Sequence, residues 1–343
     1  MERKLGVGVI GAGRIGMLHA QNLSRHVPGC RVVAIADRRV ACARAAASAS
    51  GGGDAVADPN ALLARDDIHA VVICSSTDTH TEIIRQAANA GKHIFCEKPI
   101  DHDLGRIRDA LESVQRAGVL FQVGFNRRFD PDFKSLAVRV REGDVGEPHL
   151  LRISSRDPEP PPIDYIKVSG GLFMDMSIHD LDMAHFLVAE PIVEVFAAGS
   201  AHDPAIGGAG DVDTAVVVLR YASGALCTID NSRRAVYGYD QRIEVFGSRG
   251  CLSVPNRTPT GVDHWDERGQ HRERPQHFFM QRYRESYVAE MQAFVECVRL
   301  GREPAVSGQE GLHAVQLAHA ARDSCAQNRP VRIATAAAHD DAA

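Results

Sequence analysis

The stretch Gly6-Val7-Gly8-Val9-Ile10-Gly11-Ala12-Gly13-Arg14-Ile15-Gly16 decides the fold of the first part of the chain. Its apolar start predicts a buried strand over residues 6–10, and the residues after the glycines predict an amphipathic helix over 15–25. The spacing G-x-G-x-x-G between them permits a tight turn, a close approach of the backbone to a pyrophosphate, and close packing of helix on strand. The helix N-terminus also offers free N–H groups to phosphates. The stretch therefore predicts a dinucleotide site.

An aspartate supports this prediction and indicates which dinucleotide is bound. Asp37 ends the next predicted strand, residues 31–36, at a distance of 21 residues from Gly16. A carboxylate at this point can accept hydrogen bonds from ribose hydroxyls and would repel a 2′-phosphate, which favours NAD over NADP. Arg38 and Arg39 follow directly and could soften that preference. The alternative interpretation is a glycine turn that binds no ligand.

Up to about residue 125, short apolar runs alternate with longer amphipathic runs, which predicts βαβ units and a parallel sheet. Further strands are expected at 71–74, 93–96 and 119–123, and further helices at 41–49, 79–90 and 104–117. We therefore predict an α/β Rossmann domain that binds NAD over residues 1–125.

After Gly124 the pattern changes to that of an α+β domain. Helices are expected at 131–141, 177–188, 283–300 and 311–328, and strands at 149–155, 193–200, 214–221, 225–231, 242–246 and 251–254. The spacing of these strands is typical of an antiparallel meander. We predict a substrate-binding and oligomerisation domain over 126–333 with a large, mostly antiparallel open sheet. Residues 334–343 lack apolar periodicity and are expected to be disordered.

Composition excludes several classes of function. The 343 residues carry a net charge of −5, which argues against a nucleic-acid-binding protein. No apolar run approaches the roughly 20 residues that span a bilayer, and the amino terminus leads straight into a predicted strand, without a signal peptide. The eight cysteines are scattered without a C-x-x-C pair. We therefore expect a reduced, cytoplasmic protein.

A charged tripeptide, Glu97-Lys98-Pro99, follows the predicted strand 93–96. The carboxyl ends of strands in an open α/β sheet face the ligand crevice, and Pro99 restricts Lys98 to an extended conformation. An ordinary surface loop is the alternative. Ser75-Ser76-Thr77 follows the predicted strand 71–74 and could likewise face the dinucleotide, or could form a plain turn with Thr79 as helix cap. His80 on the same rim is expected to be a polar surface residue.

A carboxylate and an imidazole stand four residues apart in the second half of the chain. If a helix runs through Asp175 and His179, the two share a face and can touch. A carboxylate fixes the tautomer of the imidazole and raises its basicity, which suits a general base. The alternatives are a capping aspartate with a surface histidine, or a metal site that uses Asp175, His179, Asp182 or His185. Because neither cysteines nor an H-E-x-x-H pattern support the latter, we expect no metal.

Together, the glycine turn, Glu97-Lys98-Pro99 and the Asp175/His179 pair resemble the Gfo/Idh/MocA oxidoreductases over essentially the whole chain. Two further stretches, residues 124–131 (GFNRRFDP) and 231–242 (NSRRAVYGYDQR), are similar to the bacterial inositol 2-dehydrogenases of that family. The resemblance implies NAD-dependent oxidation of a ring hydroxyl of myo-inositol to a ketone. In that reaction His179 removes the hydroxyl proton, Asp175 orients His179, and Lys98 stabilises developing alkoxide charge.

The site residues predicted on this basis fall into three groups. The catalytic residues are Lys98, Asp175 and His179. The cofactor-binding residues are Gly11, Gly13, Arg14, Ile15, Gly16, Asp37, Arg38, Ser75, Ser76, Thr77, Glu97 and Lys98. The substrate-binding residues are Lys98, Arg127, Asp157, Asp175, His179, Tyr239 and Tyr283, with Arg128 as the competitor of Arg127.

Alternatives remain for the substrate and for catalysis itself. A family member could act on scyllo- or chiro-inositol or another sugar, and a chain with this turn could also be a non-catalytic NAD-binding sensor. Retention of the whole catalytic set argues against the sensor. Apolar residues stand at both odd and even positions in 193–198 and 215–219, which suggests that little of the large sheet is exposed to water. Family members pair such sheets, so a homotetramer is expected.

Overall fold

The computed structural model describes residues 4–334, which form two compact units. One unit comprises the described residues up to Phe129 together with Glu285–Val315. The other comprises Asp130–Arg284 together with the described residues from Gln316 onwards. Of the predicted disordered tail, residues 335–343 lie outside the described part of the chain.

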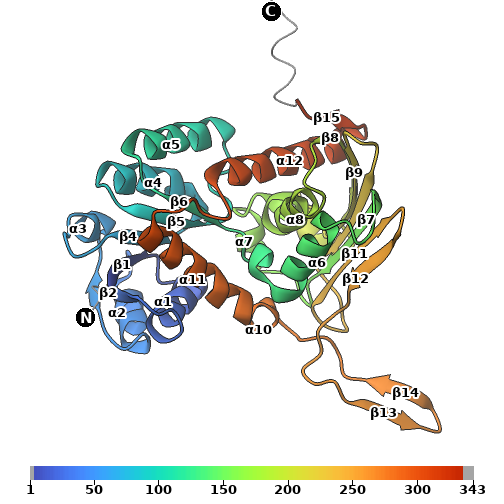
Figure 1. Ribbon diagram of the computed structural model, residues 1–343, viewed down its shortest axis with the longest axis horizontal. Helices are drawn as coiled ribbons and strands as arrows, with labels where there is room; N and C mark the ends of the chain where they lie inside the picture. The colour runs from blue at the N-terminus through green and yellow to red at the C-terminus, as the bar shows by residue number, and fades with distance from the viewer. Residues whose placement is uncertain (1–3, 335–343) are drawn as a thin grey trace, which may run out of the picture. The chain divides into compact units, whose positions relative to one another are not determined.

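The first unit contains a six-stranded parallel sheet in the order β3-β2-β1-β4-β5-β6 (Figure 1). Its strands are β1 (Leu5–Ile10), β2 (Cys30–Ala36), β3 (Asp54–Val56), β4 (Ala70–Ile73), β5 (His93–Glu97) and β6 (Phe121–Gly124). The order reverses between β1 and β4, where open α/β sheets bind ligands beyond the carboxyl ends of their strands. The predicted Rossmann fold is confirmed, with β3 as a short additional edge strand.

Helices cover both faces of this sheet, as the alternation of apolar runs predicts. They are α1 (Arg14–Arg25), α2 (Val40–Ala49), α3 (Pro59–Leu63), α4 (His80–Asn89), α5 (Leu104–Ala117) and α11 (Arg284–Leu300), with short 3-10 turns η1 (Thr77–Thr79) and η2 (Asn126–Phe129). Met291, Phe294 and Val295 of α11 are buried in one core with residues of α1, α2 and the strands. Residues 285–315 lie in the predicted second domain by sequence, yet their apolar stripe packs in the first unit. The domain division at residue 125 stays a prediction.

The second unit is built on a seven-stranded sheet in the order β12-β11-β7-β10-β9-β8-β15. Its strands are β7 (Pro148–Arg156), β8 (Ile192–Ser200), β9 (Thr214–Tyr221), β10 (Leu226–Ser232), β11 (Asp240–Gly247), β12 (Gly250–Val254) and β15 (Val331–Arg332). The mostly antiparallel open sheet is confirmed, but it is not a simple meander. β7 pairs parallel with β10 and antiparallel with β11, and so separates two strands that follow each other in the chain.

Helices pack on one face of this second sheet. They are α6 (Pro131–Arg141), α7 (Ile163–Ile166), α8 (Ile178–Val188), α9 (Pro204–Gly208), α10 (Phe279–Arg282) and α12 (Gly308–Gln327), of which α12 begins in the first unit; a π-helical turn, η3 (Phe173–Ser177), precedes α8. Tyr221 of β9 is buried and donates its hydroxyl to the carbonyl of Ala184 in α8. On the other face, Val216 and Phe246 remain about half exposed in the single chain.

A hairpin of β13 (Asp263–Asp266) and β14 (Gly269–Arg272) leaves the second unit as a two-stranded arm (Figure 1). The sequence did not predict this arm. No helix within residues 4–334 is long and apolar enough to cross a membrane.

Candidate active site

The glycine turn between β1 and α1 has the geometry that a pyrophosphate requires. Gly11 has a φ of +94°, and a Cβ there would lie 2.5 Å from the backbone nitrogen of Ser75. A Cβ at Gly16 would lie 1.8 Å from the carbonyl oxygen of Gly11, whereas one at Gly13 would meet no atom within 4 Å. The first and third glycines are therefore demanded by packing, and the second leaves room for a ligand.

Two further features of this turn fit a dinucleotide. The N-cap of α1, Gly13, has no side chain to satisfy the first N–H groups of the helix, so these can bind phosphate oxygens. The Asp37 carboxylate lies over the turn, since it accepts hydrogen bonds from the backbone N–H of Ala12 and of Arg39, each at 2.8 Å. Each oxygen keeps a lone pair that can accept from a ribose hydroxyl. The side chains of Arg14 and Arg38 are exposed beside it.

The segment Ser75-Ser76-Thr77 follows β4 at the switch point of the sheet. The Ser75 and Thr79 hydroxyls are 2.7 Å apart, and the Thr79 hydroxyl donates to the carbonyl of Ser76 at 2.7 Å. Thr79 is the N-cap of α4, but its side chain makes no capping hydrogen bond. The hydroxyls thus order the turn at the end of β4 rather than cap the helix.

His80 was predicted to be a surface residue, and this is wrong. Its side chain is buried, with Nδ1 2.9 Å from the carbonyl oxygen of Pro99 and Nε2 3.1 Å from that of Ser75. Burial lowers the pKa of His80. The periodicity of α4 shows which positions face the core, but not which loops those positions meet. It therefore could not show that the His80 imidazole links the loop after β4 to the loop after β5.

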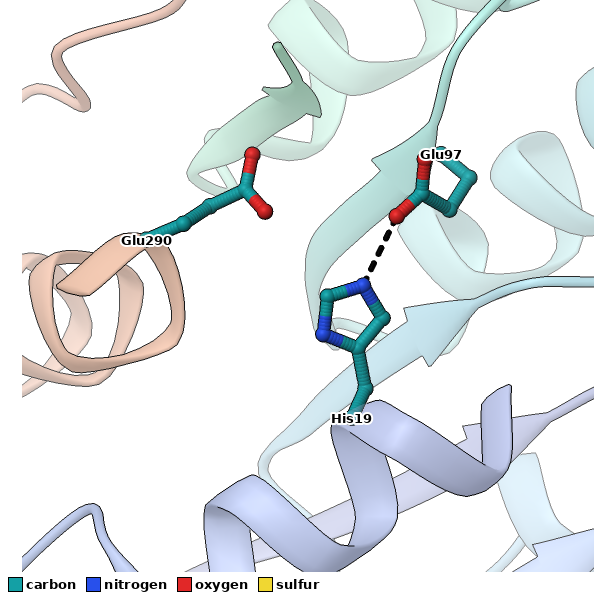
Figure 2. A group of neighbouring side chains, drawn as sticks. All are labelled: His19, Glu97 and Glu290. Carbon is teal, nitrogen blue, oxygen red and sulfur yellow. Dashed lines mark hydrogen bonds and ion pairs between the residues drawn. The ribbon is translucent and has the colours of Figure 1, made fainter. Parts of the chain in front are cut away.

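Glu97, at the end of β5, contacts a histidine of α1 (Figure 2). His19 Nε2 lies 2.7 Å from Glu97 Oε1, and His19 is completely buried. Glu290 of α11 is also completely buried and points toward this pair, and within residues 4–334 neither of its carboxylate oxygens has a hydrogen-bond partner. Burial, reinforced by the charge of Glu97, raises the pKa of Glu290 well above its ordinary value. Burial therefore favours the neutral form of Glu290.

The same three side chains have the spacing of a cation site. One ligand atom from each of His19, Glu97 and Glu290 lies within 4.8 Å of the other two. This group is separate from the metal alternative around Asp175 considered from the sequence. The expectation of no metal stays a prediction for this group.

Lys98 follows Glu97 and is half-buried, and its peptide bond to Pro99 is cis. Two arginines follow β6 in the same unit, and both are buried in η2. Arg128 donates to the Glu310 carboxylate of α12 and thereby ties two segments of the unit together. The assignment of Arg127 to the substrate stays a prediction.

In the second unit, Asp175 lies within the π turn η3, and His179 lies in the first turn of α8. Asp175 Oδ1 accepts from the Tyr165 hydroxyl at 2.9 Å, and Oδ2 accepts from Arg233 at 3.2 Å. The sequence predicted a helix only over 177–188, and the contact of Asp175 with His179 was conditional on a helix through both residues. The π turn is a difference from this expectation, and such turns are frequent at functional sites. The pairing of Asp175 with His179 stays a prediction.

Three further substrate candidates lie in the second unit. Tyr239 and Tyr283 are nearly fully buried, with ring centroids 6.0 Å apart, and the Tyr283 hydroxyl donates to Gln241 Oε1 at 3.4 Å. Asp157, directly after β7, extends the pairing with β10, because its N–H donates to the carbonyl of Ser232 at 2.9 Å. The structure thus brings the two tyrosines together and places Asp157 beside the end of β10, the strand that precedes Arg233.

Several residues around Asp175 were not singled out from the sequence. They are Tyr165, Asp211, Asn231 and Arg233. Asn231 accepts from the Ser177 hydroxyl at 2.6 Å and donates to Asp180 at 2.8 Å, so it joins β10 to the start of α8. Asn231 and Arg233 belong to the stretch 231–242 that is selective within the family, which was the available signal. Tyr165 and Asp211 carry no such signal.

A parallel sheet of this order, with a glycine turn that leaves room for a pyrophosphate and an aspartate above it, defines a dinucleotide-dependent enzyme. The chain belongs to the Gfo/Idh/MocA oxidoreductase family. The family model for the NAD-binding Rossmann fold matches residues 5–125, and that for the C-terminal alpha/beta domain matches residues 138–333. The cofactor of the first unit is therefore NAD.

Three relatives illustrate the similarity. The chain is 50% identical to the myo-inositol 2-dehydrogenase of Thermotoga maritima over 95% of this chain and 98% of that protein. A crystal structure of a putative myo-inositol dehydrogenase from Sinorhizobium meliloti is 47% identical with a TM-score of 0.93, and covers 96% of this chain and 100% of that one. The myo-inositol dehydrogenase of Lactobacillus casei in complex with NAD(H) and myo-inositol is 26% identical with a TM-score of 0.88, and covers 97% and 98%.

Proposed function

We propose that this chain is an NAD-dependent inositol 2-dehydrogenase that oxidises a ring CH–OH of myo-inositol to the ketone scyllo-inosose. The observation that carries the proposal is the 50% identity to a myo-inositol 2-dehydrogenase over nearly the full length of both chains. Retention of Lys98, Asp175 and His179 supports a catalytic protein over a non-catalytic sensor.

Bound NAD⁺ supplies the hydride acceptor, at nicotinamide C4. His179 accepts the proton of the reacting hydroxyl as general base, and Asp175 orients its imidazole. Lys98 places its ammonium against the same oxygen and stabilises the alkoxide charge that develops as the C–H bond breaks. One C–H bond and one O–H bond break, and the products are a ketone, NADH and a proton that passes from His179 to solvent.

Specificity for a cyclitol requires a partner for each ring hydroxyl, because a hydroxyl buried without one is penalised. We assign this task to Arg127, Asp157, Tyr239 and Tyr283. Three of these, Arg127, Tyr239 and Tyr283, are buried.

Initial rates of NAD⁺ reduction with myo-, scyllo- and chiro-inositol and with glucose test the proposal. We expect the highest kcat/KM with myo-inositol. A clear preference for scyllo-inositol, chiro-inositol or glucose would replace the substrate while retaining the reaction. NAD⁺ binding without turnover of any of the four would instead identify a sensor.

We further propose that the protein is a cytoplasmic homotetramer. The half-exposed Val216 and Phe246 on the open face of the second sheet support association through that face. The absence of disulfides among the eight cysteines is consistent with a reducing compartment. Light scattering at micromolar concentration is expected to give four times the chain mass, and a monomer would refute the assembly.

A further inference from the structure

Arg233 is the largest of the fully buried side chains within residues 4–334, with 1% of its surface exposed. It follows β10 directly, and its guanidinium faces two carboxylates. One nitrogen donates to Asp175 Oδ2 at 3.2 Å and the other to Asp211 Oδ2 at 3.5 Å. A buried arginine is costly unless it is paired, so this contact must be supported by the surrounding structure.

The second carboxylate is itself fixed to the beginning of the helix that carries the predicted base. Asp211 Oδ1 accepts from the backbone N–H of Leu172 at 3.0 Å. A Cβ on the neighbouring Gly171 would lie 2.7 Å from the same oxygen, and Gly171 has a φ of +79°. Glycine is therefore required at this point for Asp211 to approach the chain just before the π turn.

The other oxygen of Asp175 is held from a different segment. Tyr165 of α7 donates its hydroxyl to Asp175 Oδ1, so the carboxylate receives one hydrogen bond on each oxygen from two different elements. Two donors from separate segments define both the position and the rotation of a carboxylate, which one donor cannot do.

We propose that Arg233 is a positioning residue for the dehydrogenase reaction, holding the Asp175 carboxylate in place so that Asp175 can orient His179. This inference rests on the proposed function. With its guanidinium enclosed, Arg233 does not contact the substrate. It acts through Asp175, while Asp211 anchors Arg233 to the head of the same helix.

The residue type at this position follows from the geometry. A guanidinium is a planar fork that can donate to two carboxylates at once, whereas a lysine ammonium is a compact charge that cannot reproduce that bridge. Removal of the guanidinium would leave Asp175 and Asp211 facing each other without a cation. The carboxylate of Asp175 would then turn away from Asp211, and His179 would lose its orienting partner.

Steady-state kinetics of three variants test the inference, with the polyol that the wild type oxidises fastest as substrate. We expect Arg233→Met to lower kcat by roughly 10–100-fold and to leave the KM for NAD⁺ unchanged, because the dinucleotide-binding residues are in the other unit. Arg233→Lys should recover part of the lost kcat, since it restores the charge. The matched control is Arg234→Met, which removes an exposed arginine paired with Asp203 at 3.4 Å and should behave as wild type.

Several outcomes would overturn the inference. A folded Arg233→Met variant with wild-type kcat would do so, as would an equal loss of activity in Arg234→Met or a parallel change of kcat and of the KM for NAD⁺. If Arg233→Met does not fold, Arg233→Lys tests the inference instead. A wild-type kcat in that variant refutes the positioning role of Arg233, and a loss of kcat alone supports it. A wild type that oxidises glucose but not the inositols refutes only the proposed substrate. The effect of the Arg233 variants on kcat can then still be measured with glucose.

Discussion

His19 Nε2 lies 2.7 Å from Glu97 Oε1, and this contact joins the helix after the glycine turn to the strand end that carries Lys98. His19 is one turn beyond Gly16 in α1, and Glu97 immediately precedes Lys98. The contact therefore couples the position of the predicted catalytic lysine to that of the predicted pyrophosphate site within one unit. Glu290 is buried beside both, and this burial raises the pKa of its carboxyl group.

The raised pKa of Glu290 predicts a pH-dependent loss of stability. Below its unfolded pKa of about 4.3, Glu290 is protonated in both states. As the pH rises above that value, the unfolded state releases its proton while the folded state keeps it. The free energy of unfolding therefore falls by up to about 1.4 kcal/mol per pH unit until the folded pKa is reached.

Glu290→Gln should remove this loss, because the amide is neutral in both states. We expect the urea midpoints of Glu290→Gln and wild type to diverge increasingly from about pH 4.5 upwards, with the variant more stable at neutral pH. Glu296→Gln, an exposed change on the same helix, is the control and should follow wild type. Parallel pH profiles for Glu290→Gln and wild type would show that Glu290 is ionised in the folded protein.

The three glycines of the turn should respond differently to alanine. Gly13→Ala places its methyl group in open space, so the melting temperature should be unchanged while the Kd for NAD⁺ rises about tenfold or more, or ~1.4 kcal/mol. Gly16→Ala should instead destabilise the fold by about 1–3 kcal/mol through the clash with Gly11. Calorimetric titration and thermal melting separate the two effects. Gly208→Ala, also directed into open space, is the control, and a Gly13→Ala variant that binds NAD⁺ normally would contradict the placement of the pyrophosphate.

The position of Asp37 predicts the cofactor preference. Asp37→Ser removes the charge that repels a 2′-phosphate and leaves the exposed Arg38 and Arg39 beside the ribose site. We expect kcat/KM for NAD⁺ to fall by about 10–100-fold, consistent with loss of hydrogen bonds worth ~1–3 kcal/mol, and kcat/KM for NADP⁺ to rise. Asp109→Ser on the surface of α5 should change neither value. An unchanged ratio between the two cofactors would show that Asp37 does not contact the ribose.

The proposed base should affect kcat without affecting NAD⁺ binding, whereas Lys98, which is also a predicted cofactor-binding residue, should affect both. His179→Ala is expected to lower kcat by roughly 10²–10⁴, and Lys98→Met by roughly 10²–10³. Stopped-flow measurement of a single turnover, together with fluorescence titration of NAD⁺, separates chemistry from binding. A near-normal kcat in His179→Ala would assign the base elsewhere.

The local sequence pattern was sufficient to predict most of the helices and strands. Apart from β3 and α3, the strands of the first unit and their helices were predictable because each buried strand is a short apolar run and each helix carries an apolar stripe. The pairing of β7 with both β10 and β11 was not predictable, because a strand's own alternation shows which face is buried and not which neighbour it meets. The packing of α11 in the first unit was missed for the same reason: Phe294 shows that a face is apolar, but not what covers it.

By itself, the sequence determined the class of the protein. The glycine turn with Asp37, the lysine after β5 and the selective stretch 231–242 are local features, and local chemistry requires those residue types wherever a dinucleotide and an alcohol are to be bound. The tertiary structure alone decided the environment of each group: the burial of His80, the burial of Glu290 beside His19 and Glu97, and the pairing of Arg233 with Asp175. The physical reason is that desolvation and charge pairing depend on residues far apart in the chain, and only the folded packing brings these together.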